Sequence, residues 1–158
     1  MIRVEPMTEE RFTAFLEESI VRYAEENVRT GRWDAAHGVE QSRAEHARLL
    51  PQGLATPHEY LRSIFVADTG ARVGDLWYSH RGEGGPKQVW IFWIGIEPAH
   101  RRHGYAADAL RTVEVEARKL GSTRVGLHVF AFNSGARALY ERLGYAPTNV
   151  VMWKELGP

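Results

Sequence analysis

Three cationic or titratable side chains stand immediately before a glycine in this chain: Arg101, Arg102 and His103. Residues at helical spacing follow Gly104, so these side chains lie beside the first turn of an expected helix. A helix N-terminus offers unpaired N–H groups and a partial positive charge, which together attract anions. This pattern predicts a phosphate or pyrophosphate site. The alternative is a plain strand-to-helix turn with a solvated basic cluster.

A second candidate is the stretch from Asn133 to Tyr145. The Asn133 side chain can cap a helix, and the inner stripe of that helix carries a phenol. The stripe consists of Ala136, Leu139, Tyr140 and Leu143. Taken alone, these residues favour an ordinary packed helix.

Taken together, the two stretches resemble the GCN5-related N-acetyltransferase (GNAT) superfamily. RRHGYA, residues 101–106, matches the family pattern Q/R-x-x-G-x-G/A, and residues 133–145 match N-x-x-A-x-x-L-Y-x-x-x-G-F/Y. Both motifs occur in the family's order with a helix and a strand between them, so the resemblance spans nearly the whole chain. It implies an enzyme that moves an acetyl group from acetyl-CoA directly to a primary amine in a ternary complex.

The resemblance also implies which residues bind acetyl-CoA. Backbone N–H groups of the turn would hold its pyrophosphate, while Arg101 and Arg102 would add positive charge. Ile94 and Ile96 would bond the pantetheine arm where strand four splays from strand five, and the Ile94 N–H would polarise the acetyl carbonyl. The implied cofactor-binding residues are Ile94, Ile96, Arg101, Arg102, His103, Gly104, Tyr105, Ala106, Asn133, Ala136 and Tyr140.

Tyr140 matches the family tyrosine that donates a proton to the departing thiolate. A phenol, with a pKa of about 10, suits that donation. The alternative is a structural tyrosine that lines the cofactor channel.

A base is also needed, because an alkylammonium acceptor must lose a proton before it attacks. Positions where relatives carry a base hold Trp90, Phe92 and Gly95, which accept no proton. His128 is the predicted base, because it lies where some relatives place a catalytic glutamate and histidine titrates near neutral pH. The alternatives are a structural histidine and an ordered water linked to the backbone or to Glu97.

The acceptor pocket is expected between the first two helices, their loop and the neighbouring strands. Aromatic side chains could line this pocket or simply fill the core. The predicted substrate-binding residues are Trp33, Trp77 and Trp93, with Tyr78 and His80 as further candidates. An antibiotic, a metabolite, a polyamine and a protein amine all stay open as acceptor. No metal site is predicted, since no carboxylate or third ligand accompanies His100 and His103.

Hydrophobic spacing predicts the elements that position these residues. The expected helices are Thr8 to about Gly31, Val39–Leu50, the stretch from Gly104 to Gly121, and residues 134–144. The expected strands are residues 2–7, 63–68, 73–80, 88–97, 124–132 and 149–156, with turns at 69–71 and 82–86. Strand 88–97 is apolar on both faces and is therefore expected inside the sheet.

The expected order is β-αα-βββ-α-β-α-β, one domain over residues 1–158 of the α/β (α+β) class. The resemblance adds a GNAT-type mixed, mostly antiparallel central sheet, with splayed strands four and five and flanking helices.

Composition limits the function classes. The 158 residues are 44% hydrophobic and 25% charged, as in ordinary globular proteins. Lys plus Arg equals Asp plus Glu at 20 each, which disfavours nonspecific nucleic-acid binding. The chain has no cysteine, which excludes a cysteine nucleophile and fits a reducing cytoplasm, the predicted location. Neither a signal-peptide core nor a stretch of membrane-spanning length occurs, so no membrane partner is expected.

Two further alternatives stay open. A non-catalytic acyl-CoA-binding regulator would keep the cofactor site without turnover. A homodimer could form through the closing strand NVVMW, if its edge is exposed.

Overall fold

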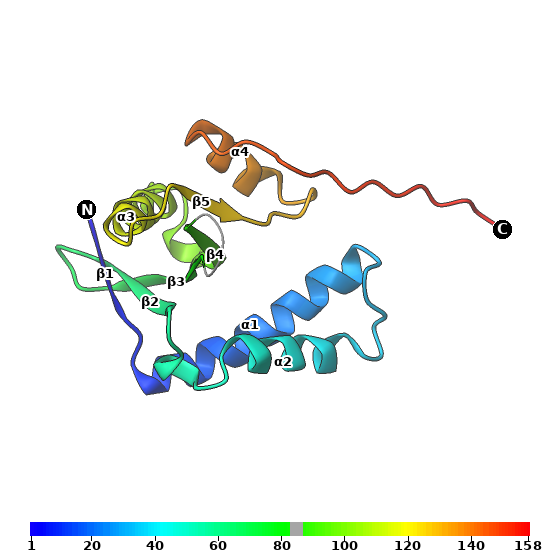
Figure 1. Cartoon of the computed structure of the whole chain (residues 1–158), viewed down its shortest axis with the longest axis horizontal. Helices are drawn as coiled ribbons and strands as arrows, with labels where there is room; N and C mark the ends of the chain where they lie inside the picture. The colour runs from blue at the N-terminus through cyan, green and yellow to red at the C-terminus, as the bar shows by residue number, and fades with distance from the viewer. Residues whose placement is uncertain (83–86) are drawn as a thin grey trace. The chain divides into compact units, whose positions relative to one another are not determined.

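The computed structural model of the chain describes residues 1–82 and 87–158 (Figure 1). The chain forms two compact units, Met1–His128 and Val129–Pro158. The single domain expected over residues 1–158 stays a prediction. The turn expected at 82–86 lies, apart from Gly82, outside the described residues.

A five-stranded sheet is the framework of the first unit. In spatial order its strands are β1 (Ile2–Pro6), β2 (Glu59–Val66), β3 (Arg72–Arg81), β4 (Gln88–Ile96) and β5 (Arg124–Leu127). The pairs from β1 to β4 are antiparallel, and β4 runs parallel to β5. The predicted mixed, mostly antiparallel sheet is therefore confirmed, with strand β4 inside it.

Helices cover both faces of this sheet, with the α1–α2 pair on one side and α3 on the other (Figure 1). Their bounds are α1 Glu9–Arg29, α2 Gly38–Leu49 and α3 Tyr105–Lys119. Helix α1 begins where predicted, because the Thr8 hydroxyl accepts the N–H of Arg11 at 3.1 Å. Helix α3 ends before Gly121, whose φ of 77° suits a C-terminal cap.

An aromatic-rich core joins α1 and α2 to the sheet. Its buried residues are Met7, Phe12, Phe15, Leu50, Leu61 and Trp77. A buried histidine links the two helices: Nδ1 of His46 donates to the Ser42 carbonyl, and Nε2 accepts from the Ser19 hydroxyl, each at 2.8 Å. Burial lowers the pKa of His46, which keeps the ring neutral and suited to both bonds. The helix pair thus packs as one layer on one face of the sheet.

The strand bounds differ from expectation in three places. Strand β2 begins at Glu59, four residues before the predicted start at Ser63. Strand β5 ends at Leu127 although the apolar pattern continues to residue 132, because its pairing with β4 stops there. The closing strand predicted at 149–156 is wrong: these residues form no strand in the described chain. β-propensity does not create a strand without a hydrogen-bonding neighbour.

The second unit contains helix α4 (Ser134–Arg142), close to its predicted bounds. Asn133 caps α4 as predicted, its side-chain oxygen accepting the N–H of Ala136 at 3.3 Å. Beyond α4, the apolar side chains of Val150–Trp153 are exposed. The homodimer suggested for this segment stays a prediction.

Candidate functional site

Strand β4 contains one extra residue relative to β3, at the level where its pairing with β5 ends. The register of β4 with β3 passes from Ile91 to Trp93 and leaves Phe92 as a β-bulge. The last parallel pair between β4 and β5 joins Ile91 to Leu127, at the same level as the bulge. Within the described residues, β4 beyond Ile91 therefore has β3 as its strand neighbour and an opening on its other side. The predicted splay of strands four and five is confirmed.

The opening is bordered by the backbone of Ile94 and Ile96. The N–H of Glu97 donates to the Val73 carbonyl of β3 at 2.9 Å. Backbone groups point alternately to the two sides of an antiparallel strand, so those of Ile96 and Ile94 point away from β3. An extended ligand with amide groups could pair with this edge as a neighbouring strand would.

The chain then passes through a tight turn into α3. After the short helix η2 (Pro98–His100), Arg102 and Gly104 both adopt left-handed conformations, with φ of 68° and 83°. The first helical bond runs from the Asp108 N–H to the Gly104 carbonyl, at 3.1 Å. The N–H groups of residues 105–107 therefore have no acceptor within the helix. Left-handed residues beside a helix N-terminus are typical of anion-binding loops.

Two side chains of the motif brace this turn. His103 donates from Nδ1 to the Arg101 carbonyl at 2.8 Å, and its ring stacks on Tyr105 with centroids 5.5 Å apart. Arg101 folds back and donates from Nε to the Ile96 carbonyl at 3.0 Å. The turn is thus tied to the end of β4. Within the described chain, neither Arg101 nor Arg102 pairs with a carboxylate.

An open pocket with a volume of about 190 Å³ lies beside the turn. Residues from α1, β3, β4 and the turn line it, and charged side chains predominate. The charged lining consists of Arg11, Arg22, Arg72, Arg101, Glu18, Asp75 and Glu97. Trp93, Gly95 and Ile96 form the β4 wall, so the pocket adjoins the strand segment that leads to the turn.

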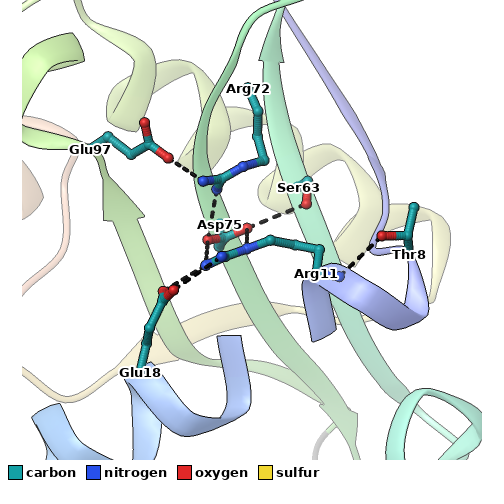
Figure 2. Close-up of polar contacts among 7 residues, drawn as sticks. All are labelled: Thr8, Arg11, Glu18, Ser63, Arg72, Asp75 and Glu97. Carbon is teal, nitrogen blue, oxygen red and sulfur yellow. Dashed lines mark hydrogen bonds and ion pairs between the residues drawn. The ribbon is translucent and has the colours of Figure 1, made fainter. Parts of the chain in front are cut away.

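A carboxylate on β3 organises most of these charges (Figure 2). Asp75 accepts Nη2 of Arg11 at 2.7 Å and Nη1 of Arg72 at 3.0 Å. Arg11 also donates from Nη2 and Nη1 to Glu18, and Arg72 donates from its other terminal nitrogen to Glu97. Hydrogen bonding to Glu18, with further support from Asp75, raises the pKa of Arg11 despite its burial. Sequence spacing could not reveal this network, because Arg11 and Asp75 are 64 positions apart.

The three tryptophans predicted to bind substrate lie in different surroundings. Trp93 lines the pocket, with its ring edge-on to Phe15 and under the guanidinium of Arg22, 4.9 Å from the centroid. Trp77 is only 2% exposed and belongs to the core. Trp33 packs against Tyr23, with ring centroids 5.3 Å apart. The structure therefore brings one of the three to the pocket.

The predicted base, His128, directly follows the last paired residue of β5. The residue keeps part of its surface in solvent. Partial desolvation is nevertheless the main cause that lowers its pKa; the positive charge of Arg32 lowers it further, and Glu26 opposes both. The imidazole is therefore neutral, and able to accept a proton, over a wider pH range than an ordinary histidine.

The remaining predicted residues belong to the second unit. Asn133 and Ala136 form the capped first turn of α4. Tyr140 lies on the same helix, its ring 5.9 Å from that of Tyr145. Two negative findings concern the described residues alone: no cluster of three His, Cys, Asp or Glu could hold a metal ion, and no helix is long and apolar enough to cross a membrane.

The fold and both motifs define an acyl-transfer protein, and comparison with known proteins gives the same class. The sequence model of the acetyltransferase (GNAT) family matches residues 11–145, and the chain belongs to this family. It is 37% identical over 153 residues to the uncharacterized N-acetyltransferase YdgE of Bacillus subtilis (strain 168), covering 97% of each chain. It is also 37% identical over 155 residues to YycN from the same strain, covering 98% of this chain and 99% of YycN.

Solved structures agree with this assignment. The crystal structure of YycN from Bacillus subtilis superposes with a TM-score of 0.92 over the whole of both chains. The aminoglycoside 6′-N-acetyltransferase AAC(6')-Ih from Acinetobacter baumannii shares the fold, with a TM-score of 0.61 and 19% identity over 100% of this chain and 99% of that one. The protein is an acetyltransferase of the GNAT family.

The left-handed Arg102 gives a prediction about stability. Such a conformation costs a side-chain-bearing residue about 1 kcal/mol, which glycine would not incur. We expect Arg102→Gly to leave the free energy of unfolding unchanged or to raise it slightly, because glycine's extra chain entropy offsets part of the gain. Chemical denaturation measures this. Arg101→Gly is the matched control and should destabilise, since Arg101 has a negative φ and bonds Ile96. Equal losses in both variants would contradict the prediction.

Proposed function

We propose that the protein transfers the acetyl group of acetyl-CoA to a primary amine in a ternary complex, without a covalent enzyme intermediate. One observation carries this proposal: the segment of β4 that lacks a strand partner on one side leads directly into a left-handed turn at a helix N-terminus. The edge suits an extended arm with amide groups, and the turn suits a pyrophosphate. Acetyl-CoA has both, and when bound it would supply the activated thioester.

The first unit would hold acetyl-CoA through its backbone. N–H groups of residues 102–106 would bond the pyrophosphate, and Arg101 and Arg102 would add positive charge. The Ile96 N–H would pair with the pantetheine arm, since the Ile96 carbonyl already accepts from Arg101. The Ile94 N–H would donate to the oxygen on which negative charge develops. From the second unit, Asn133, Ala136 and Tyr140 would contribute as the motif implies.

Proton transfer falls to two side chains. His128 would take the proton from the attacking nitrogen as the C–N bond forms, either directly or through one water. The Tyr140 hydroxyl would donate its proton to the sulfur as the C–S bond breaks, and would regain a proton from solvent.

Among the predicted aromatic residues, we assign acceptor contact to Trp93 because it lines the charged pocket. A cytoplasmic location is likewise proposed from the cysteine-free composition.

Binding of acetyl-CoA is the first test. Acetyl-CoA should raise the Tm by mass action, and NAD should raise it much less. Ala106→Glu should abolish most of this shift, because a carboxylate would face the phosphates. The same carboxylate should slightly raise the Tm without ligand, since negative charge stabilises a helix N-terminus. Ala106→Gln has nearly the same size without the charge and is the control. No binding to the unmodified protein at millimolar acetyl-CoA would refute the proposed function.

The second test concerns the thiolate. Tyr140→Phe keeps the ring and removes the acid, so kcat should fall by roughly 10²–10⁴-fold with little change in acetyl-CoA affinity. Tyr145→Phe is the matched control, because the family pattern accepts phenylalanine at that position. Steady-state rates with a panel of amines (a polyamine, an aminoglycoside and a lysine peptide) measure both variants. Equal kcat in Tyr140→Phe and the unmodified protein, with chemistry rate-limiting, would make Tyr140 a packing residue. Acetyl-CoA binding without turnover of any amine would favour the regulator.

The third test is the pH dependence assigned to His128. A base acts in its neutral form, so kcat/KM should rise with pH through the pKa of His128. Since desolvation and Arg32 lower that pKa, the midpoint should lie below the ordinary value of about 6.5. His128→Asn, which can orient water but cannot take a proton, should lose this limb and recover activity at high pH as more amine becomes neutral. If His128→Asn keeps full activity and the same rise of kcat/KM with pH, the general base is a water held elsewhere.

A further inference from the structure

Asp75 is a buried carboxylate that joins three elements of the first unit. Its side chain is 8% exposed and accepts hydrogen bonds from Arg11 of α1, Ser63 of β2 and Arg72 of β3. Figure 2 shows these donors gathered around one carboxyl group. A buried charge with this many partners is costly to disturb, because removing it leaves the arginines without compensation.

The network extends to the residue where the turn begins. Arg72 bonds Asp75 with one terminal nitrogen and Glu97 with the other. The backbone of Glu97 is also fixed, since its N–H donates to Val73 and its carbonyl accepts from His100, at 2.9 and 2.8 Å. Glu97 is therefore attached to β3 through both its side chain and its backbone, immediately before the turn starts.

Two glycines lie close together where β3 and β4 meet near this network. Gly74 on β3 and Gly95 on β4 bring the two backbones together, and a Cβ on Gly74 would clash with the Gly95 carbonyl. A Cβ on Gly95 would lie 2.8 Å from the indole nitrogen of Trp93. With no side chains at these two positions, the charged pairs supply side-chain contacts between β3 and the end of β4.

We infer that Asp75, acting through Arg72 and Glu97, is a positioning residue that fixes the pyrophosphate-binding turn in its binding geometry. This inference rests on the proposed function, because it assigns the turn to acetyl-CoA. It gives the network a role at a distance: none of the three side chains needs to touch the ligand.

Removal of a carboxylate distinguishes positioning from long-range electrostatics, because the two effects change the affinity for acetyl-CoA in opposite directions. Without Asp75 or Glu97 the surroundings of the turn become more positive, so long-range attraction alone would tighten binding of anionic acetyl-CoA. Loss of positioning would weaken it. We expect Asp75→Asn and Glu97→Gln each to raise the Kd and the KM for acetyl-CoA by about tenfold. The relative rise in the KM for acetyl-CoA should exceed the relative fall in kcat at saturating acetyl-CoA, since positioning of the turn acts on cofactor binding.

Isothermal titration and steady-state kinetics measure these values. Glu17→Gln is the matched control, because it breaks an exposed ion pair with Arg43 between α1 and α2. Its Kd and KM should equal those of the unmodified protein. Glu97 is 40% exposed, so Glu97→Gln remains a test if Asp75→Asn fails to fold. Unchanged or tighter binding in Glu97→Gln would overturn this inference and leave the proposed function intact. A fall in kcat with constant KM would also overturn it and make Glu97 part of the chemistry. No binding to the unmodified protein would refute both proposals.

Discussion

The structure depends most on the backbone of β4 beyond Ile91, which among the described residues has no strand partner on the side away from β3. On that side, the carbonyl of Ile96 accepts a hydrogen bond from the side chain of Arg101. Buried N–H and C=O groups are rarely left unpaired, and an open strand edge attracts any extended chain that can pair with it. Here the bulge at Phe92 and the end of β5 at Leu127 leave such an edge in the interior of the sheet order. A ligand that completes the edge gains main-chain bonds without needing particular side chains. This explains why the isoleucines at 94 and 96 carry no chemical signal of their own.

The same bulge also arranges the aromatic side chains. An extra residue changes which face the following side chains occupy, so Phe92 and Trp93 both lie toward α1 and α2. Phe92 stacks on Trp77 at 4.5 Å, while Trp93 meets Phe15 edge-on at 5.5 Å. One aromatic ring thereby closes the core and the next lines the pocket. A single insertion in the ladder thus couples the opening of the sheet to the wall of the candidate site.

Local signals in the sequence predicted local structure well. Thr8 and Gly121 marked helix ends because capping depends on a few neighbouring residues, and Gly104 marked the turn for the same reason. The strand limits after Leu127 and the closing strand were predicted wrongly, since pairing depends on a distant partner. The network of Asp75 and the core position of Trp77 could not be predicted from the sequence. They arise from contacts between segments far apart in the chain. The sequence alone does not distinguish an aromatic residue of the core from one that lines a pocket.

The distribution of charge explains how a chain with no net charge can carry a locally positive turn. Asp75, Glu18 and Glu97 pair with Arg11 and Arg72, so the arginines nearest the strand surface are compensated within the fold. The arginines of the turn pair with no carboxylate among the described residues, and their charge adds to that of the α3 N-terminus. Local positive potential therefore comes from selective pairing, because nearby charges dominate over distant ones at physiological ionic strength. The balance of acids and bases over the whole chain therefore says little about the charge at one place, which depends on the local pairs and on the helix N-terminus.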